Sequence, residues 1–501
     1  MADRVMRRGG LTVVLLALLV IAPAAMSQDL AGFEKRLTKF TLDNGLTFLI
    51  LERHEAPVVS FHTYADVGAV DEVTGFTGLA HLFEHMAFKG TQTVGTNDYQ
   101  AEAAALAKMD DLFVALRKQK GDQANPEMLK KLQEQFDQAG VEAQKYIVHD
   151  EYEESLTQQG ADGFNAYTSE DATQYIVSLP SNKLELWMML EAQRFAHPVL
   201  REFYKEKDVV MEERRMMENS PTGRLYEEFE GIAFIAHPYR DGVIGHMSDL
   251  QALSRPEAEA FFKAHYGPSN LTIAIVGDVD PGNVKRLAEK YFAGIPSGPK
   301  PDPVRTVEPP QRGERRVTME DAAQPLVLIG YHQPNVNHPD TAALEVVSEI
   351  VGVGRTSRLY KSLIKEQKIA VSANAGLNPT KYPSLFMFYV VPAKGHTTQE
   401  CEQAVYAQIE KLQTEPVAPE ELKKAKTRSR ASVIRELDSN SGLAAELTFC
   451  EVVMGDWRNL FKELDKIEQV TAADVQRVAQ TYFTKKNRTV GVIETAAGAS
   501  R

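Results

Sequence analysis

A short segment, Gly78–Gly90, carries three side chains that could bind and use a metal ion. It reads GLAHLFEHMAFKG, so His81, Glu84 and His85 stand at positions i, i+3 and i+4. On an α-helix this spacing places the three side chains on one face within a single turn. Two imidazoles so placed can hold one Zn²⁺ at about 2.0–2.1 Å per nitrogen, and a carboxylate beside them can take a proton from a water molecule. The spacing therefore predicts a helix with His81 and His85 as zinc ligands and Glu84 as general base.

The alternative for this segment is an amphipathic core helix whose histidines are merely hydrogen-bonded. Apolar residues flank the polar ones and indicate a buried helix; they are Leu82, Phe83, Met86 and Phe88. A buried cluster of two histidines and a glutamate is energetically costly without a metal. The metal-binding interpretation is therefore favoured.

A second acidic segment supplies a candidate for the missing third ligand. The run 206–214 reads EKDVVMEER, and Glu206 and Glu213 are seven residues apart, so they share a helix face, whereas Glu212 is rotated by about 100°. An acidic helix is by itself more often a solvated face. However, a catalytic zinc site with two histidines commonly takes Glu as its third protein ligand, and the apolar run 209–211 lies alongside. We expect Glu213 to bind the metal and Glu206 to orient the ligands from behind.

Composition limits the classes of protein and of partner. The chain has 501 residues, 43% hydrophobic and 25% charged, which is typical of globular proteins and long enough for more than one domain. Its net charge of −13 argues against nucleic acids and anionic membranes as partners. Cys401 and Cys450 are the only cysteines. They could pair, or both could be free buried thiols.

The first 27 residues have the pattern of a cleaved secretory signal peptide. Three arginines precede an apolar run from Leu11 to Ala22, and small residues end near Ser27. The apolar run is shorter than the roughly 20 residues needed to span a membrane, and no cysteine follows it for a lipoprotein anchor. No later segment is long and apolar enough to span a bilayer. We expect an exported protein, with the bacterial periplasm as its default location.

Several elements must position the candidate ligands. Residues 40–51 predict a β-hairpin with its turn at Asn44-Gly45, and residues 58–67 predict a further strand. Residues 101–158 contain two long, charged, amphipathic segments and predict a helical hairpin, which we interpret as a solvated insertion outside the chemistry. Strand character returns from residue 163.

An internal repeat organises the rest of the chain. The pairs Ser254/Thr471, Tyr266/Phe483, Asn270/Asn487 and Thr272/Thr489 all match at one offset of 217, through a helix cap, a helix end and a strand. One offset across such different features indicates two copies of one domain. We expect a zinc-bearing domain at 28–295, a Pro-rich linker at 296–310 and a second domain at 311–501. The second copy lacks His-x-x-Glu-His and is interpreted as a structural half.

With these residues together, the chain resembles the inverzincin metallopeptidases of family M16. The resemblance rests on the inverted motif His81–His85, the later Glu206 and Glu213, and the duplication, and it covers nearly the whole mature chain. It implies an α+β chain of two homologous α/β domains with the LuxS/MPP-like metallohydrolase fold, forming a clamshell half or chamber. The interval from His85 to Glu213 exceeds the usual family spacing, and the insertion at 101–158 accounts for the excess.

The resemblance also implies roles for single residues. His81, His85 and Glu213 would bind one Zn²⁺ per chain, Glu84 would be the general base, and Glu206 would support the ligands. A further implication is an edge strand that binds a peptide substrate as an added strand. The residues of that strand are Gly163, Asn165 and Ala166.

One departure from the family pattern concerns the second half. Active members usually carry an Arg and, seven residues later, a Tyr that hold substrate and stabilise the tetrahedral intermediate; here Ile364 and Val371 occupy these places. Neither can donate a hydrogen bond, and losing such a donor can cost about 10²–10³ in rate. Two-chain family members divide these roles, so we expect a homologous partner subunit, or else a homodimer. The alternative is substitution within the chain by Lys365, Arg355 or Arg358.

The expected activity is that of a zinc metalloendopeptidase acting on short or unfolded polypeptides. Two other classes remain open. One is a non-catalytic, peptide-binding or structural subunit, although such members usually lose the ligands that this chain retains. The other is zinc storage, or a chaperone that binds peptide without cleaving it.

Overall fold

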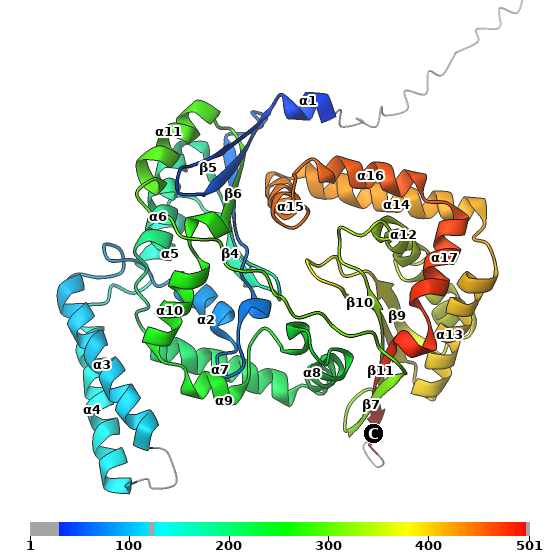
Figure 1. The fold of residues 1–501 in the computed structure, drawn as a ribbon, viewed down its shortest axis with the longest axis horizontal. Coiled ribbons are helices and arrows are strands. Elements are labelled where there is room, and N and C mark those ends of the chain that lie inside the picture. The colour runs from blue at the N-terminus through cyan, green and yellow to red at the C-terminus, as the bar shows by residue number, and fades with distance from the viewer. Residues whose placement is uncertain (1–29, 120–124, 497–501) are drawn as a thin grey trace, which may run out of the picture.

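The structure is a computed structural model that describes residues 30–119 and 125–496. The expected signal peptide at 1–27 lies outside these residues. Within the described ranges the strands form two sheets, one of six strands in the order β1-β2-β6-β3-β5-β4 and one of five in the order β7-β11-β8-β10-β9. Helices cover both sheets (Figure 1). This arrangement confirms the predicted α+β class.

The six-stranded sheet belongs to the first half of the chain. Its strands are β1 (Leu37–Thr41), β2 (Thr47–Glu52), β3 (Val58–Ala65), β4 (Asp162–Thr168), β5 (Thr173–Pro180) and β6 (Leu271–Gly277). The helices of this half are α1 (Leu30–Glu34), α2 (Leu79–Met86), α3 (Tyr99–Gln119), α4 (Pro126–Gln144), α5 (Glu151–Thr157), α6 (Leu184–Ala196), α7 (Phe203–Asn219), α8 (Pro221–Ala233), α9 (Met247–Ala252), α10 (Arg255–His265) and α11 (Pro281–Phe292).

The five-stranded sheet belongs to the second half. Its strands are β7 (Arg315–Asp321), β8 (Leu326–Gln333), β9 (Ala370–Gly376), β10 (Ser384–Pro392) and β11 (Arg488–Thr495). The helices are α12 (Thr341–Val351), α13 (Thr398–Thr414), α14 (Pro419–Asp438), α15 (Asn440–Val452), α16 (Asn459–Gln469) and α17 (Ala472–Tyr482), with a π-helical segment, η5, at Tyr360–Glu366.

The two sheets have the same topology. In the first, β6 pairs parallel with β2 and antiparallel with β3; in the second, β11 pairs parallel with β7 and antiparallel with β8. The outer pairs β5–β4 and β10–β9 are both antiparallel. The first sheet differs by its extra edge strand β1, which forms the predicted hairpin with β2 around Gly45, a residue with φ of 98°.

The helix before each central strand repeats in atomic detail. Helices α10 and α17 each begin with a capping box, formed by Ser254 with Glu257 and by Thr471 with Asp474. After each helix an asparagine amide donates to a carbonyl near the helix end, at 2.9 Å in both halves. These bonds join Asn270 to His265 and Asn487 to Tyr482, and they keep the offset of 217 found in the sequence. The tandem duplication is thereby confirmed.

The halves exchange one helix each. Helix α8 follows the first-half helix α7 but packs on β7 and β11 of the second sheet, whereas the second-half helix α15 packs on β3 and β6 of the first (Figure 1). The apolar face of α8 and that of α15 are each buried in a mixed core. The two halves therefore share core residues in both directions.

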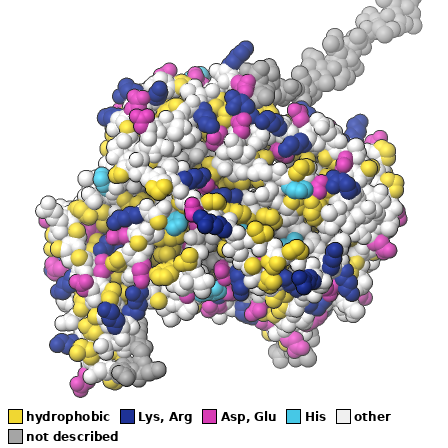
Figure 2. Space-filling view, in the orientation of Figure 1, with side chains coloured by type: hydrophobic (Ala, Val, Ile, Leu, Met, Phe, Trp, Pro, Cys, Tyr) yellow, Lys and Arg dark blue, Asp and Glu magenta, His cyan; other side chains and the backbone are white. Residues whose placement is uncertain are grey.

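The expected helical hairpin is formed by α3 and α4, which project from the body of the first half (Figure 1). Its base is fixed by buried charges: Arg255 pairs with Asp110, and Arg201 with Glu102. On the face shown in Figure 2, cationic and anionic side chains are interspersed. Among the described residues no helix combines the length and hydropathy needed to cross a bilayer. Cys401 and Cys450 are both free and buried, so the paired alternative is excluded.

Candidate metal centre

Helix α2 presents the motif because its other side is buried. Its buried residues are Leu79, Ala80, Leu82, Phe83 and Met86, so His81, Glu84 and His85 lie on the side that remains partly open. The helix start is held by Glu72, whose carboxylate accepts hydrogen bonds from the backbone N–H groups of Gly78 and Ala80, each at 2.7 Å. This fixes the first turn of the helix and hence the direction of the histidines.

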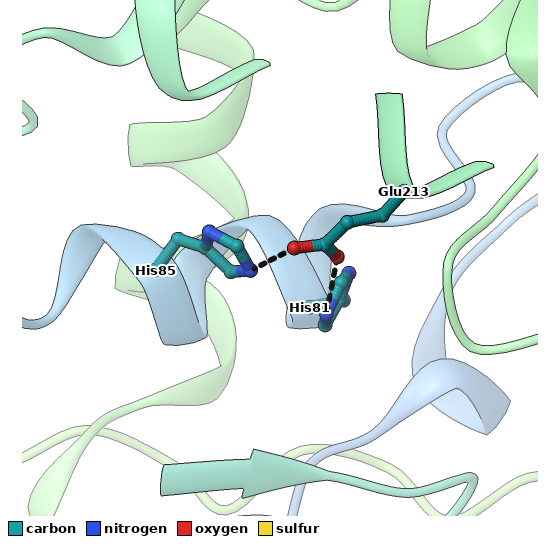
Figure 3. Close-up of side chains that lie close together, drawn as sticks. All are labelled: His81, His85 and Glu213. Atoms are coloured by element: carbon teal, nitrogen blue, oxygen red, sulfur yellow. Dashed lines mark ion pairs between the residues drawn. The ribbon is translucent and has the colours of Figure 1, made fainter. Parts of the chain in front are cut away.

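Helix α7 brings a carboxylate to both histidines. Glu213 Oε2 lies 3.6 Å from His81 Nε2, and its Oε1 lies 3.8 Å from His85 Nε2. One donor atom from each of the three residues falls within 4.8 Å of the others. Figure 3 shows the Glu213 carboxylate lying between the two rings. The structure thus brings together the three residues predicted as ligands.

The donor set fits zinc. Two imidazole nitrogens and one carboxylate oxygen are the protein ligands of many catalytic zinc sites, which keep a further position open. Burial and the neighbouring His85 lower the pKa of His81 to about 4, so the His81 ring is neutral at pH 7, as a ligand must be. The distances between donor atoms are also close enough for one ion to contact all three.

Glu84, the expected general base, is held by a residue that the sequence did not single out. The hydroxyl of Thr168, the last residue of β4, donates to Glu84 Oε2 at 2.6 Å. One carboxylate oxygen is thereby engaged while the other is left to react. Partial burial raises the pKa of Glu84 above its usual value despite this hydrogen bond. A raised pKa suits a group that must accept a proton and then return it.

Glu206 lies behind His85, on the same face of α7 as Glu213. Its Oε2 lies 3.4 Å from His85 Nδ1, and its Oε1 pairs with the ammonium group of Lys89. Burial opposes ionisation of Glu206, but these two partners outweigh it and lower its pKa to about 2. For His85, burial favours the neutral ring, but the hydrogen bond that His85 donates to Glu206 and the nearby carboxylates raise the pKa overall. Glu206 is thus an ionised acceptor for the far nitrogen of His85.

A pocket of about 300 Å³ opens beside Glu84 and His85. Its lining includes Phe88 and Lys89 and also residues 147–153, which run from the segment after α4 into the first turn of α5. These last residues belong to the segment 101–158, which was expected to lie outside the chemistry. The final part of the segment thus borders the pocket, while the expectation that it takes no part in the chemistry stays a prediction.

The expected substrate-binding residues lie on β4, at the edge of the first sheet and in contact with α2. Gly163 and Asn165 are exposed, whereas Ala166 is buried. Between Asp162 and Asn165 the pairing with β5 is irregular, and Gly163 has a φ of 62°. β4 has a hydrogen-bonded neighbour on one side only, so its other side is open to an added strand.

The second half presents apolar groups at the two family positions that usually carry donors. Ile364 lies in the π-helical segment η5 and packs against the second core, and Val371 lies on β9 and is exposed. Arg358, one suggested substitute, is engaged by both oxygens of Glu421 at 3.0 and 2.7 Å. This pairing argues against Arg358 as a substrate donor.

Sequence reasoning missed four residues that hold the site, namely Glu72, Lys89, Thr168 and Arg201. Two signals were available: Lys89 stands four residues after His85, and Thr168 two residues after Ala166 on the same strand face. Nothing local pointed to Glu72 or Arg201. Their contacts depend on how the loops around α2 fold back.

Comparison with known proteins gives two matching family models. Residues 47–111 and 142–245 match the model described as Insulinase (Peptidase family M16), and residues 252–429 match the Peptidase M16 inactive domain. The first match omits the middle of the α3–α4 hairpin. The second begins at the end of α9 in the first half and ends within α14, so it spans parts of both halves and does not include the His-x-x-Glu-His motif.

Individual proteins give the same result. A Zinc protease PqqE of Helicobacter pylori is 27% identical over 452 residues, 88% of this chain and 89% of that protein. A crystal structure of a protease from Helicobacter pylori has a TM-score of 0.77 at 26% identity and covers 91% of this chain and 99% of that one. The periplasmic protease PqqL from Escherichia coli shares the fold, with a TM-score of 0.69 at 17% identity, over 93% of this chain but 48% of the longer one.

Proposed function

Because the chain belongs to peptidase family M16, we propose that it is a zinc-dependent endopeptidase that hydrolyses peptides or unfolded polypeptides. The observation that carries this proposal is the approach of Glu213, from a separate helix, to within 3.6 and 3.8 Å of the two motif histidines. His81, His85 and Glu213 would hold one zinc ion. When bound, zinc polarises the scissile carbonyl and acidifies water.

The protein residues around the ion would move the protons. Glu84 lies on the same helix turn as the histidines and accepts the proton of the attacking water. Its second oxygen stays hydrogen-bonded to Thr168, which keeps the reactive oxygen directed towards the substrate. Glu84 then returns the proton to the leaving amine. Glu206 accepts the hydrogen bond of His85 Nδ1, which leaves Nε2 as the metal-binding nitrogen.

The substrate would bind as an additional strand along β4. The free side of this edge strand and its exposed residues Gly163 and Asn165 support this mode, with Ala166 as a buried neighbour. Main-chain pairing requires an extended segment, which short peptides and unfolded chains provide and compact proteins do not. We therefore expect extended peptides as substrates.

A homologous partner would complete the site. Ile364 and Val371 cannot donate hydrogen bonds to a tetrahedral intermediate, so the donors would come from a second M16-like chain. The E. coli chain that shares this fold is about twice as long as the part matched here. A unit of this size can therefore be joined to additional polypeptide, which supports pairing with a second unit. The test is to assay the purified chain with and without a homologue that carries the Arg and Tyr. If the chain alone cleaved peptides as fast as it does with the homologue, the proposal that a partner completes the site would be contradicted.

Export would place the enzyme in the bacterial periplasm after removal of residues 1–27. The Arg-rich start, the apolar run and the small residues before position 28 support this location. N-terminal sequencing of the protein from a periplasmic fraction should find Gln28 first. An uncleaved N-terminus in the cytoplasmic fraction would contradict export.

The central experiment replaces the proposed base. Glu84→Gln should reduce cleavage of a quenched-fluorescence peptide library by about 10²-fold or more, while the zinc content stays near one per chain. Glu212→Gln, an exposed acid on α7, is the matched control and should keep wild-type activity. If Glu84→Gln cleaved as fast as the wild type, the peptidase proposal would fail.

The second candidate is a peptide-binding subunit without catalysis. The apolar residues at the two donor positions favour it. It predicts that the wild type and Glu84→Gln bind peptides equally and that neither cleaves them, even with a homologous partner present.

A further inference from the structure

Lys89 lies just beyond the end of α2, and its side chain turns back towards the metal centre. Its ammonium group bonds Glu206 Oε1 and lies 3.8 Å from Glu202 Oε2. Only 22% of the side chain is exposed. Lys89 is thus a largely enclosed cation whose strongest contact is the carboxylate that also serves His85.

Glu206 is held at both of its oxygens. Oε2 faces His85 Nδ1 at 3.4 Å, and Oε1 is bonded by Lys89. A carboxylate with one donor can still rotate about its last side-chain bond, whereas donors on both oxygens fix the plane of the group. The direction of the hydrogen bond to His85 therefore depends on Lys89.

The backbone of Lys89 is fixed as well. Its carbonyl accepts a hydrogen bond from the guanidinium group of buried Arg201, which also donates to the carbonyls of Thr91 at 2.7 Å and Val94 at 2.9 Å. Glu102 neutralises Arg201 at 2.8 Å. With its main chain tied in this way, Lys89 can reach Glu206 without ordering a mobile loop.

We propose that Lys89 is a positioning residue of the metal centre. It fixes Glu206 so that this carboxylate accepts the Nδ1 proton of His85 and leaves the Nε2 lone pair of His85 directed at the metal. This inference rests on the zinc site of the proposed function. Partners of this kind, outside the ligand set, typically affect metal affinity by about 10–100-fold.

The test compares the zinc dissociation constants of variants, measured by competition with a chromophoric chelator. Lys89→Met should weaken zinc binding about tenfold or more, and Lys89→Arg, which keeps the cation, should restore it to within about threefold of wild type. Lys205→Met removes an exposed lysine of α7 that pairs with Glu202, and it should leave the affinity unchanged. Each of these proteins should still unfold cooperatively without metal, and Lys89→Arg should keep the melting temperature of the wild type.

A double-mutant cycle separates positioning from loss of folding. In a Glu206→Gln background Lys89 has no carboxylate to orient, so Lys89→Met should cost little further affinity. Equal costs in both backgrounds, or a Lys89→Met protein that binds zinc as tightly as the wild type, would overturn the assignment. A wild-type protein that binds no zinc would instead overturn the proposed function on which this inference depends.

Discussion

At the scale of single residues, Glu84, the proposed general base, is hydrogen-bonded to the strand that is proposed to bind substrate. Thr168 closes β4 and donates to Glu84 at 2.6 Å, while the proposed substrate contacts lie a few residues earlier on the same strand. A shift of β4 would therefore also shift Glu84. The contact with Glu84 is made by the hydroxyl group of Thr168 and not by its methyl group.

Removing this hydroxyl should slow catalysis without removing the metal. We expect Thr168→Val, which keeps the shape of the side chain, to lower kcat by roughly tenfold or more, because a hydrogen bond to a charged group contributes about 1.5–3 kcal/mol. Thr168→Ser keeps the donor and should stay near the wild-type kcat. Steady-state kinetics with one fluorogenic peptide and zinc analysis measure both quantities. A loss shared equally by Val and Ser variants would argue against the donor role.

The approach of these side chains to one another could be predicted because most of the site is local. His81, Glu84 and His85 meet by helix spacing alone, and Glu213 followed from its helix phase with Glu206 and from the need for a third ligand. The spacing of Lys89, four residues after His85, was a signal, but its contact with Glu206 did not follow from it, because α2 ends at Met86 and the path of the chain beyond it depends on Arg201.

At the scale of elements, three helices of the second half bring together two half-buried acids and an exposed one. Glu345 on α12 and Glu446 on α15 both have a pKa raised to about 7, first by burial and then by neighbouring carboxylates that include Glu436 on α14. In the unfolded chain these groups ionise near pH 4.5. Ionisation of these two acids therefore lowers the free energy of unfolding as the pH rises.

The sign of this effect can be tested with Glu446→Gln in the metal-free protein. The contribution of Glu446 to stability should fall as the pH rises from about 4.5 to 7 and then level off, because the unfolded state releases the proton first. The variant lacks this loss, so above pH 7 it should be more stable by roughly 1–3 kcal/mol, and near pH 4.5 it should match the wild type. Thermal unfolding of both proteins near pH 4.5 and at pH 8 would measure this difference in stability. A variant that is less stable at pH 8 would contradict the assignment.

Helix α8 makes a second prediction at this scale. Phe229 is fully buried against Gly330 of β8 and Gly491 of β11, where a methyl group would come within 2.8 and 3.0 Å of its ring. Phe229→Ala should therefore lower the free energy of unfolding by about 3–5 kcal/mol. Met216→Ala, at an exposed position of α7, is the matched control and should change it little. Chemical denaturation measures the free energy of unfolding of both variants. If Phe229→Ala were as stable as Met216→Ala, the packing of α8 on the second sheet would contribute little to stability.

Sequence patterns predicted which segments form helices or strands better than they predicted which other segments these elements contact. The amphipathic pattern gave α3 and α4 with ends within a few residues. It could not show that residues 147–153 line the pocket beside the metal centre, because that path depends on main-chain hydrogen bonds from Val148 to the Gly95 carbonyl and from Asn97 to the Tyr146 carbonyl. Such contacts join segments that are distant in sequence.

At the scale of the whole molecule, the exchange of α8 and α15 makes each half incomplete alone. The face of the first sheet that carries Leu49, Leu51 and Val276 is covered by α15 and its neighbours from the second half. The repeat showed which segments correspond, but it did not show on which sheet each helix packs. Periodicity gives the buried face of a helix and not the identity of what covers it.

Separating the halves should therefore abolish folding. We expect residues 28–295 expressed alone to aggregate, since the fragment would expose an apolar sheet face. Co-expression with residues 296–501 should restore a soluble complex that binds zinc like the intact chain. Size-exclusion chromatography and circular dichroism would distinguish these results. A soluble, cooperatively unfolding first fragment would contradict the prediction.

The junction of α7 and α8 gives the metal centre a mechanical connection to the far half. Ser220 ends α7 and also caps α8, and Gly223 fits so closely against the Met217 carbonyl that a methyl group there would approach to 2.6 Å. Glu213 lies about two turns before this rigid elbow, whereas α8 beyond it is embedded in the second sheet. Because this elbow joins the two helices with little slack, a displacement of α8 with the second half should also move α7 and the Glu213 carboxylate.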